Sequence, residues 1–204
     1  MPAVYELTTL EIKVFSNAKV YEALQQSLPN AGGTLVGAFA SDIGELSQVL
    51  LLRRFDSADA LTDARLAMLM ATDPLGCGEW LVKLQSQSFA LFPFLADPQP
   101  GAMGKWYEFR TYSIRQGVLA QTIEAWKEAC PKRTALSPMV GAFTALDGEQ
   151  PRFLNIWAYD SVDARAHIRA EAVRQGVWPP VGGPANLTKM VSTLCAPLAF
   201  SPLK

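Results

Sequence analysis

The stretch Tyr5-Glu6-Leu7-Thr8-Thr9 returns later in the chain as Tyr107-Glu108-Phe109-Arg110-Thr111. Two further stretches repeat in the same order, Val-Gly-Ala-Phe at 36–39 and 140–143, and Asp-Ser-x-Asp-Ala at 56–60 and 160–164. The separation stays between 102 and 104 residues, so one unit occurs twice with almost no insertion. Solenoid repeats are about 20 to 50 residues long, and this unit therefore has the length of a whole domain.

The second copy has the pattern of a β-α-β-β-α-β unit. Residue types alternate over 106–114, which predicts a strand, and apolar residues at helical spacing follow over 118–130. We expect Pro131 to end this helix, because proline interrupts the hydrogen-bond ladder. The remaining elements are predicted as strands over 135–146 and 153–159, a helix capped by Ser161 that runs to about Gln175, and a strand over 188–197. This order is the ferredoxin-like arrangement.

The first copy divides in the same way. Its predicted elements are strands over 3–13, 33–43, 46–55 and 82–92 and helices over 17–29 and 57–71. We predict an α+β fold with two domains, residues 1–95 and 106–204, joined by a linker over 96–105. The two helices of such a unit cover one face of its sheet only, so the bare faces are expected to pack together. The predicted architecture is an intrachain dimeric α+β barrel.

Composition limits the classes of partner. Half of the residues are hydrophobic, 18% are charged and the net charge is -1, so we expect neither nucleic acid nor an anionic membrane surface as a partner. The first residues lack the features of a signal peptide, and no apolar run approaches the length of about 18 residues that spans a bilayer. The three cysteines are far apart, which favours reduced, partly buried thiols in a cytoplasmic protein.

Several motifs of known chemistry are missing from the sequence. It contains no GxGxxG, P-loop, GxSxG, HExxH or CxxC pair, so we expect no cofactor and no metal. His167 is the only histidine and is predicted to lie on a helix facing solvent, with work as a general base as the alternative. The Pro74–Trp80 segment is expected to form a short extra helix or a lid, and the pattern assigns it no role.

Two strands of the second unit carry the candidate ligand-binding residues. Glu108, Arg110 and Tyr112 lie on one strand face, either as an ion pair that fixes the strands or as a polar surface on which Arg110 holds a carboxylate. Asn155, Trp157 and Tyr159 share a face of another strand, which suits either ordinary packing or stacking on a flat ligand.

The helix behind these strands adds two arginines, Arg165 and Arg169. We expect both to pair with carboxylates such as Glu108, and we interpret Arg169 as structural because Arg65 repeats it in the first unit. At the positions that form the polar and aromatic face of the second unit, the first unit has Thr8, Leu10 and other residues. The first unit is therefore interpreted as a degenerate copy. Any ligand site is therefore expected in the second unit.

These residues resemble a known family. The stretches that carry the resemblance are Trp106 to Tyr112 with Gly117, and Asn155 to Ser161 with Arg165, Arg169 and Trp178 beyond it. They are similar to two hallmarks of the NIPSNAP family, across the whole second unit and more loosely in the first. The resemblance implies a tandem-repeat, bacterial-type member with a dimeric α+β barrel fold, related to cofactor-independent monooxygenases.

The resemblance implies no established reaction. We expect a protein of undefined biochemical function that binds a small, partly aromatic or carboxylate-bearing molecule in its second unit. The alternative is a cofactor-independent, monooxygenase- or isomerase-like enzyme. A third alternative is a scaffold, in which two copies of the intrachain pseudo-dimer associate as a homodimer.

Overall fold

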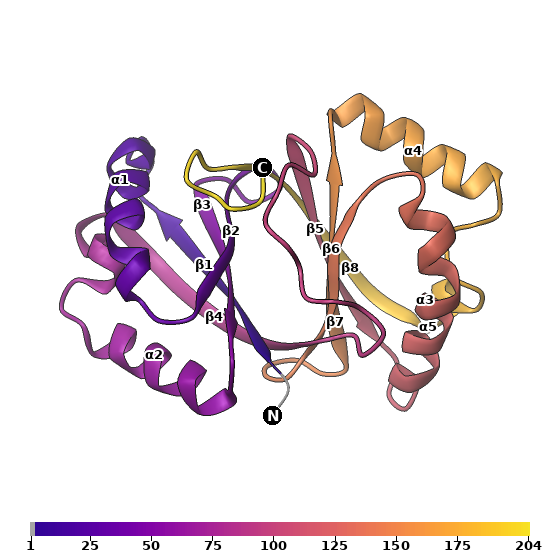
Figure 1. The fold of residues 1–204 in the computed structure, drawn as a ribbon, viewed down its shortest axis with the longest axis horizontal. Coiled ribbons are helices and arrows are strands. Elements are labelled where there is room, and N and C mark those ends of the chain that lie inside the picture. The colour runs from indigo at the N-terminus through magenta and orange to yellow at the C-terminus, as the bar shows by residue number, and fades with distance from the viewer. Residues whose placement is uncertain (1–2) are drawn as a thin grey trace.

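The computed structural model describes residues 3–204. Each half has the predicted order β-α-β-β-α-β, with short helical turns added (Figure 1). The elements are β1 (Val4–Ile12), α1 (Asn17–Ser27), η1 (Leu28–Asn30), β2 (Thr34–Ile43), β3 (Gln48–Phe55), α2 (Ala58–Met70), η2 (Pro74–Gly76), η3 (Gly78–Trp80), β4 (Leu81–Leu91), β5 (Trp106–Ile114), α3 (Leu119–Thr134), β6 (Met139–Ala145), β7 (Arg152–Tyr159), α4 (Val162–Arg174), α5 (Gly183–Asn186) and β8 (Leu187–Pro197).

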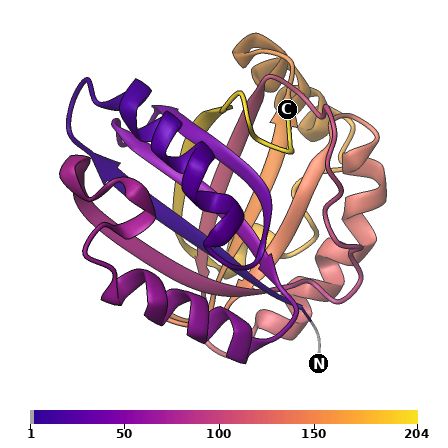
Figure 2. The ribbon, with the colours of Figure 1, turned by 60° about the vertical axis from the view of Figure 1, so that its left-hand side comes forward.

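The two sheets close into one antiparallel barrel in the order β1-β3-β2-β8-β5-β7-β6-β4. Each half supplies four neighbouring strands, and the halves join where β2 pairs with β8 and β4 pairs with β6. The helices of each half lie on the outer side of its own sheet (Figures 1 and 2). The predicted intrachain α+β barrel is thus confirmed.

The buried residues form three clusters, one inside the barrel and one between each sheet and its helices. The central cluster lies inside the barrel and draws on both halves, with Tyr5, Phe39, Tyr107 and Phe143 among its largest members. One outer cluster lies between the first sheet and its helices and is rich in leucine, and the other lies between the second sheet and its helices and is rich in aromatic residues. The central cluster forms only when the two sheets meet, because each sheet contributes one side of it.

The repeated Val-Gly-Ala-Phe stretch fixes a bend in β2 and in β6. The strand register shifts just before Gly37 and again just before Gly141. A side chain at either glycine would meet the ring of the phenylalanine two residues later, because a Cβ there would lie 2.4 Å from Phe39 and 2.5 Å from Phe143. Each glycine therefore leaves space for an aromatic ring of the central cluster.

The helices begin where predicted, and one of them ends later. Ser57 and Ser161 accept hydrogen bonds from the backbone N–H groups of Ala60 and Ala164, as expected of N-caps. The prediction that Pro131 ends its helix was wrong, because α3 continues to Thr134. The extra turn buries the Arg133 side chain against the sheet, and its contacts offset the hydrogen bond that the proline removes.

That extra turn also shortens the strand that follows. The predicted strand over 135–146 begins only at Met139. The Pro74–Trp80 segment forms two short 3-10 turns, η2 and η3.

The end of the chain returns to the first half. The N–H of Leu198 donates to the carbonyl oxygen of Ala38 at 2.8 Å, and the N–H of Ala38 donates to Ser201 Oγ at 3.0 Å. Leu203 is fully buried in the central cluster and forms a bridge with Gly101 in the connection between the halves. The last residues therefore complete the covering of the first sheet.

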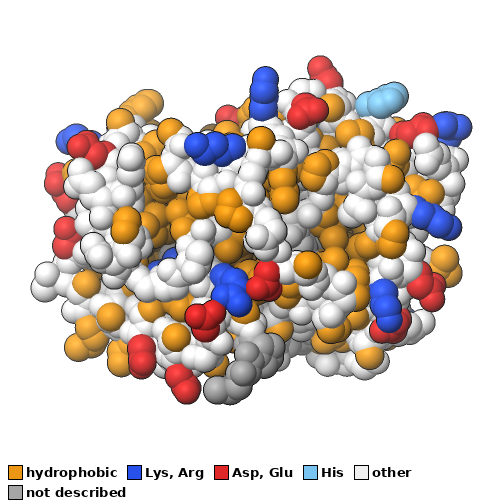
Figure 3. Space-filling model, viewed as in Figure 1, with side chains coloured by type: hydrophobic (Ala, Val, Ile, Leu, Met, Phe, Trp, Pro, Cys, Tyr) orange, Lys and Arg blue, Asp and Glu red, His pale blue; other side chains and the backbone are white. Residues whose placement is uncertain are grey.

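The surface carries charges of both signs. On the face seen in Figure 3, basic and acidic side chains are interspersed, some of them next to each other, with apolar side chains between them. No helix among residues 3–204 combines the length and hydrophobicity of a membrane span. Cys77, Cys130 and Cys195 are buried and form no disulfide, and burial raises the pKa of the Cys130 thiol to about 12.

Gly141→Ala is expected to destabilise the fold. The added Cβ would displace the Phe143 ring, and overpacking of this kind costs about 1–3 kcal/mol. The free energy of unfolding, measured by urea denaturation, should fall by that amount, whereas Thr188→Ala on the exposed part of β8 should change it by less than about 0.5 kcal/mol. Equal denaturation midpoints for Gly141→Ala and the parent protein would contradict this role of the glycine.

Candidate functional site

Strand β5 divides its side chains between two environments. Tyr107 and Phe109 point into the barrel and belong to the central cluster. Glu108, Arg110 and Tyr112 alternate with them and therefore face the opposite side, where α3 and α4 lie (Figure 1). The second half thus places an acid, a guanidinium and a phenol between its sheet and its helices.

Glu108 is fully buried and lies at the centre of an ion-pair network. Its Oε1 accepts hydrogen bonds from Arg110 Nη1, from Arg165 Nη2 at 2.6 Å and from Ser192 Oγ at 2.7 Å. Burial alone would raise the pKa of Glu108, but the hydrogen bond from Arg165 and the charge of Arg110 outweigh it and lower the pKa to about 2. The ion pair that one interpretation of this strand predicted is confirmed.

The first half contains a related network with different arginines. Glu6, the counterpart of Glu108, accepts from Arg53 at 2.5 Å and from Arg65 Nε at 2.7 Å. Arg65 also donates to Ser88 Oγ at 2.8 Å. Arg169, the counterpart of Arg65, comes no closer than 3.9 Å to Glu108 Oε2 and makes no hydrogen bond within residues 3–204. The two copies therefore use the same carboxylate but hold this arginine differently.

Arg133 is a second cation of the site, which the sequence reading missed. Its side chain is only 2% exposed, and it donates to Ser137 Oγ at 2.8 Å and to Tyr159 Oη at 3.2 Å. Its guanidinium lies 4.2 Å from the centre of the Trp157 ring, within the range of a cation–π contact. No carboxylate of the described chain reaches Arg133 within ion-pair distance.

Aromatic side chains enclose this polar group. Trp178 lies in the loop after α4, and its ring contacts Trp126 of α3 edge to face at 4.8 Å and Trp157 of β7 at 5.5 Å. Trp126 in turn contacts Phe153 at 5.2 Å. These edge-to-face contacts help to hold the rings in place.

A cleft of about 260 Å³ opens between these rings, the sheet and the loop. It is lined by Arg110, Tyr112, Thr122, Trp126, Phe153, Arg169, Val173, Trp178, Pro179, Pro180, Gly183, Pro184, Leu187 and Met190. A narrower recess of about 40 Å³ shares five of these residues and adds Arg133, Trp157 and Tyr159. We call the first space the aromatic cleft and the second the inner recess.

The structure brings most of the predicted site residues together. Arg110 and Tyr112 line both spaces, and Trp157 and Tyr159 line the inner recess. Glu108 and Asn155 lie buried beneath them, where Asn155 Nδ2 donates to the carbonyl oxygen of Arg110 and Asn155 Oδ1 accepts from the Trp157 indole.

His167 lies apart from these residues. It is exposed on α4 and lines neither the aromatic cleft nor the inner recess. Among residues 3–204, no group of three or more His, Cys, Asp or Glu side chains is arranged to hold a metal ion.

The corresponding space in the first half is filled by aliphatic side chains. Leu10, Leu24 and Leu51 occupy the positions of Tyr112, Trp126 and Asn155, and all three are fully buried in the leucine-rich cluster. The difference between the halves therefore follows directly from the sequence at matched positions.

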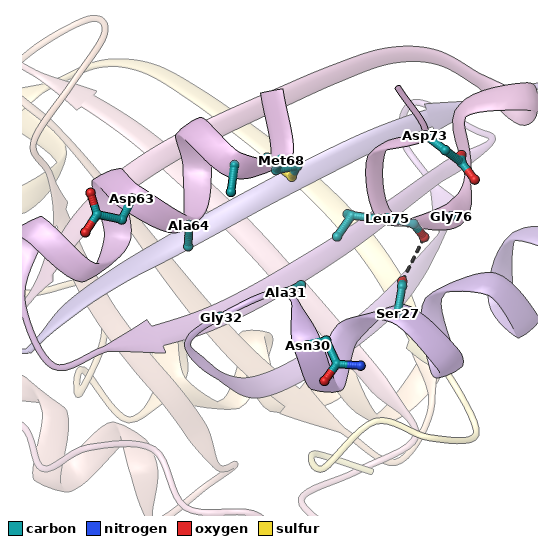
Figure 4. Close-up of a pocket in the computed structure, with 11 residues that line it drawn as sticks. Ser27, Asn30, Ala31, Gly32, Asp63, Ala64, Met68, Asp73, Leu75 and Gly76 are labelled. Carbon is teal, nitrogen blue, oxygen red and sulfur yellow. Dashed lines mark hydrogen bonds between the residues drawn. The ribbon is translucent and has the colours of Figure 1, made fainter. Parts of the chain in front are cut away.

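A larger but more open recess of about 500 Å³ lies elsewhere in the first half, between α1, α2 and η2 (Figure 4). The exposed carboxylates of Asp63 and Asp73 lie toward its two ends, and Ser27 Oγ donates to the carbonyl oxygen of Leu75 at 2.7 Å. No charged side chain among its lining residues is buried. It offers a ligand little that is specific, and we do not assign it a role.

Glu108→Gln is expected to lower stability and flatten its pH dependence. The pKa of Glu108 in the folded protein, about 2, lies below the pKa of about 4.3 of a glutamate in an unfolded chain. The carboxylate therefore stabilises the fold above about pH 4.3, and this contribution is lost as the pH falls toward 2. Loss of the charge should lower the free energy of unfolding at pH 7 by about 3 kcal/mol. Urea denaturation at pH 7, 5 and 3 checks this, with the exposed Glu124→Gln as control, and an unchanged pH profile would refute it.

Comparison with known proteins supports the family resemblance seen in the sequence and the barrel fold seen in the structure. The NIPSNAP family model matches residues 3–84 and 107–202, one segment in each half. The chain is 26% identical to a NipSnap homolog of Dictyostelium discoideum, over 96% of this chain and 87% of that protein. It is also 26% identical to human NipSnap homolog 2, over 84% of this chain and 62% of the human protein, so it spans less than two thirds of that relative.

Solved structures with the same fold have little sequence in common with this chain. A protein of Lactobacillus acidophilus provisionally named a monooxygenase has a TM-score of 0.70 at 10% identity, covering 97% of this chain and 94% of its own. An anthrone oxidase-like protein has a TM-score of 0.68 at 13% identity, covering 99% and 94%. These likenesses establish the barrel fold alone. The two matched segments cover most of the sequence, and the chain therefore belongs to the NIPSNAP family.

Proposed function

We propose that the second half binds a small, partly aromatic molecule in the aromatic cleft. The observation that carries this proposal is the contrast between the halves, because the cleft is open and lined by Trp126 and Trp178 where the first half is filled with leucines. Sites for small molecules are concave and mostly apolar, with a few polar groups that orient the ligand. The aromatic cleft has this composition.

The size of the cleft limits the ligand to one or two rings. A cavity of about 150 Å³ is known to accept benzene, and the aromatic cleft has about 260 Å³. Tyr112 supplies a polar group for orientation. Its oxygen accepts from Arg110 Nε at 2.5 Å, so the proton of the phenol is free to donate to an oxygen atom of the ligand.

A second candidate function is cofactor-independent oxygenase or isomerase chemistry on such a molecule. Its support is the Tyr112 phenol in the cleft, together with the names of the two fold neighbours, a provisional monooxygenase and an anthrone oxidase-like protein. The lining of the cleft and the inner recess contains no histidine, cysteine or carboxylate that would serve as a base. Binding without turnover is therefore the function we favour.

Trp178→Ala is expected to weaken binding of 2-naphthol, a neutral two-ring probe. The substitution removes one side of the cleft, and loss of an aromatic contact of about 1.4 kcal/mol corresponds to about tenfold in the dissociation constant. Isothermal titration calorimetry measures the effect. The matched control is Trp80→Ala, a partly buried tryptophan of the first half, which should bind the probe like the parent protein.

Oxygen consumption, measured on the same purified protein, tests for catalysis separately from binding. Oxygen consumption with hydroquinone or anthrone, without added cofactor, should stay at the rate of the buffer alone. Turnover that is lost in Tyr112→Phe would instead support the oxygenase alternative. Absence of binding by any neutral or charged two-ring aromatic molecule at millimolar concentration would refute the proposed function.

A further inference from the structure

We propose that the inner recess binds the carboxylate of an aromatic monocarboxylate, held by Arg133 and Arg169 while the ring occupies the aromatic cleft. This inference rests on the binding function proposed above and adds the chemical class of the ligand. It also moves the anion-binding role from Arg110, where the strand pattern suggested it, to two arginines on the helices.

The first observation is an excess of positive charge. Four guanidinium groups, from Arg110, Arg133, Arg165 and Arg169, surround the single carboxylate of Glu108. Within residues 3–204 no other carboxylate lies within ion-pair distance of these arginines. The site therefore has a net excess of three positive charges, and a bound anion would reduce this excess.

The second observation concerns which arginines are free to bind a ligand. Arg110 and Arg165 both donate to Glu108 Oε1, and Arg110 also donates to Tyr112. Arg165 has no counterpart in the first half, where Leu61 stands at its position. Arg169 instead lies 3.9 Å from Glu108 Oε2, makes no hydrogen bond within residues 3–204, and lines both the cleft and the recess.

Arg133 faces the same recess from α3. It uses two of its five N–H donors on Ser137 and Tyr159, so donors remain for a ligand. Its guanidinium carbon lies 4.2 Å from the centre of the Trp157 ring, and this cation–π contact helps to hold the group in place. Burial lowers the pKa of Arg133, and a bound anion would offset the cost of keeping this group charged.

The dimensions of the two spaces fit a ring that bears a carboxylate. The inner recess of about 40 Å³ is only slightly larger than the roughly 30 Å³ that one water molecule takes up in the liquid. It therefore suits a small planar anion rather than a bulky one. The recess and the cleft share Tyr112, Arg169 and Trp178, so a ring in the cleft would direct its substituent to the two arginines.

The test compares 2-naphthoate with 2-naphthamide, which differ in charge but hardly in shape. Calorimetric titration of the parent protein should give at least tenfold tighter binding of 2-naphthoate. Arg169→Leu should remove this preference, because it takes away one of the two arginines that hold the carboxylate. Arg174→Leu, which alters an exposed arginine of the same helix, should leave the preference unchanged.

Arg133 is tested by the conservative variant Arg133→Lys, which keeps a buried cation and is checked for folding by circular dichroism. Loss of the planar fork should weaken 2-naphthoate binding at least fivefold. Equal binding of the two probes by the parent protein would overturn the assigned class and leave the proposed function standing. Failure of both probes to bind would overturn both. Unchanged preference in Arg169→Leu and Arg133→Lys would overturn the assignment of these arginines.

Discussion

The structure depends on the burial of two apolar sheet faces against each other. Each sheet has helices on one side only, and the other side presents large side chains such as Tyr5, Phe39, Tyr107 and Phe143. These residues leave water only when the second sheet covers them, so neither half has a complete core by itself. The short pairings of β2 with β8 and β4 with β6 then close the edges that two open sheets would expose.

Joining the two units in one chain allows them to differ. A homodimer of identical units must carry the same site twice, whereas here the central cluster is shared and the outer clusters have changed independently. The first half kept Glu6 with two close arginines and filled the remaining space with leucine side chains. The second half has Glu108 at the matching position, together with Arg165, Arg133 and a group of tryptophans around an open cleft. The two halves thus differ in their outer clusters while they share one core.

Much of this could be read from the sequence, and the failures have physical causes. The period-two pattern of Glu108, Arg110 and Tyr112 correctly predicted a shared strand face and an ion pair. Arg133 was missed because Pro131 suggested an early helix end, although Trp126, Cys130 and Arg133 lie at spacings of four and three residues and so share the buried face of α3. Tertiary burial outweighed a local signal in this case.

Single side-chain contacts could not be predicted from the match between the two halves. Arg169 matches Arg65 in the repeat and was expected to have the same structural role. The sequence does not determine which of several arginines bonds to one carboxylate. In the structure Arg110 and Arg165 both bond to Glu108 Oε1, whereas Arg169 lies 3.9 Å from Oε2 and makes no hydrogen bond within residues 3–204. The helix that carries His167 was predicted, and so was the exposure of this side chain to solvent.

The path of the last residues bears on how the molecule is made. Strand β2 of the first sheet takes its outer neighbour from β8, and Ala38 takes both of its hydrogen bonds to the tail from residues that follow β8. A ribosome synthesises β8 after every other strand of the barrel, so the first unit keeps an open β2 edge until β8 has emerged. The barrel can therefore close only after the strands of both halves have been synthesised.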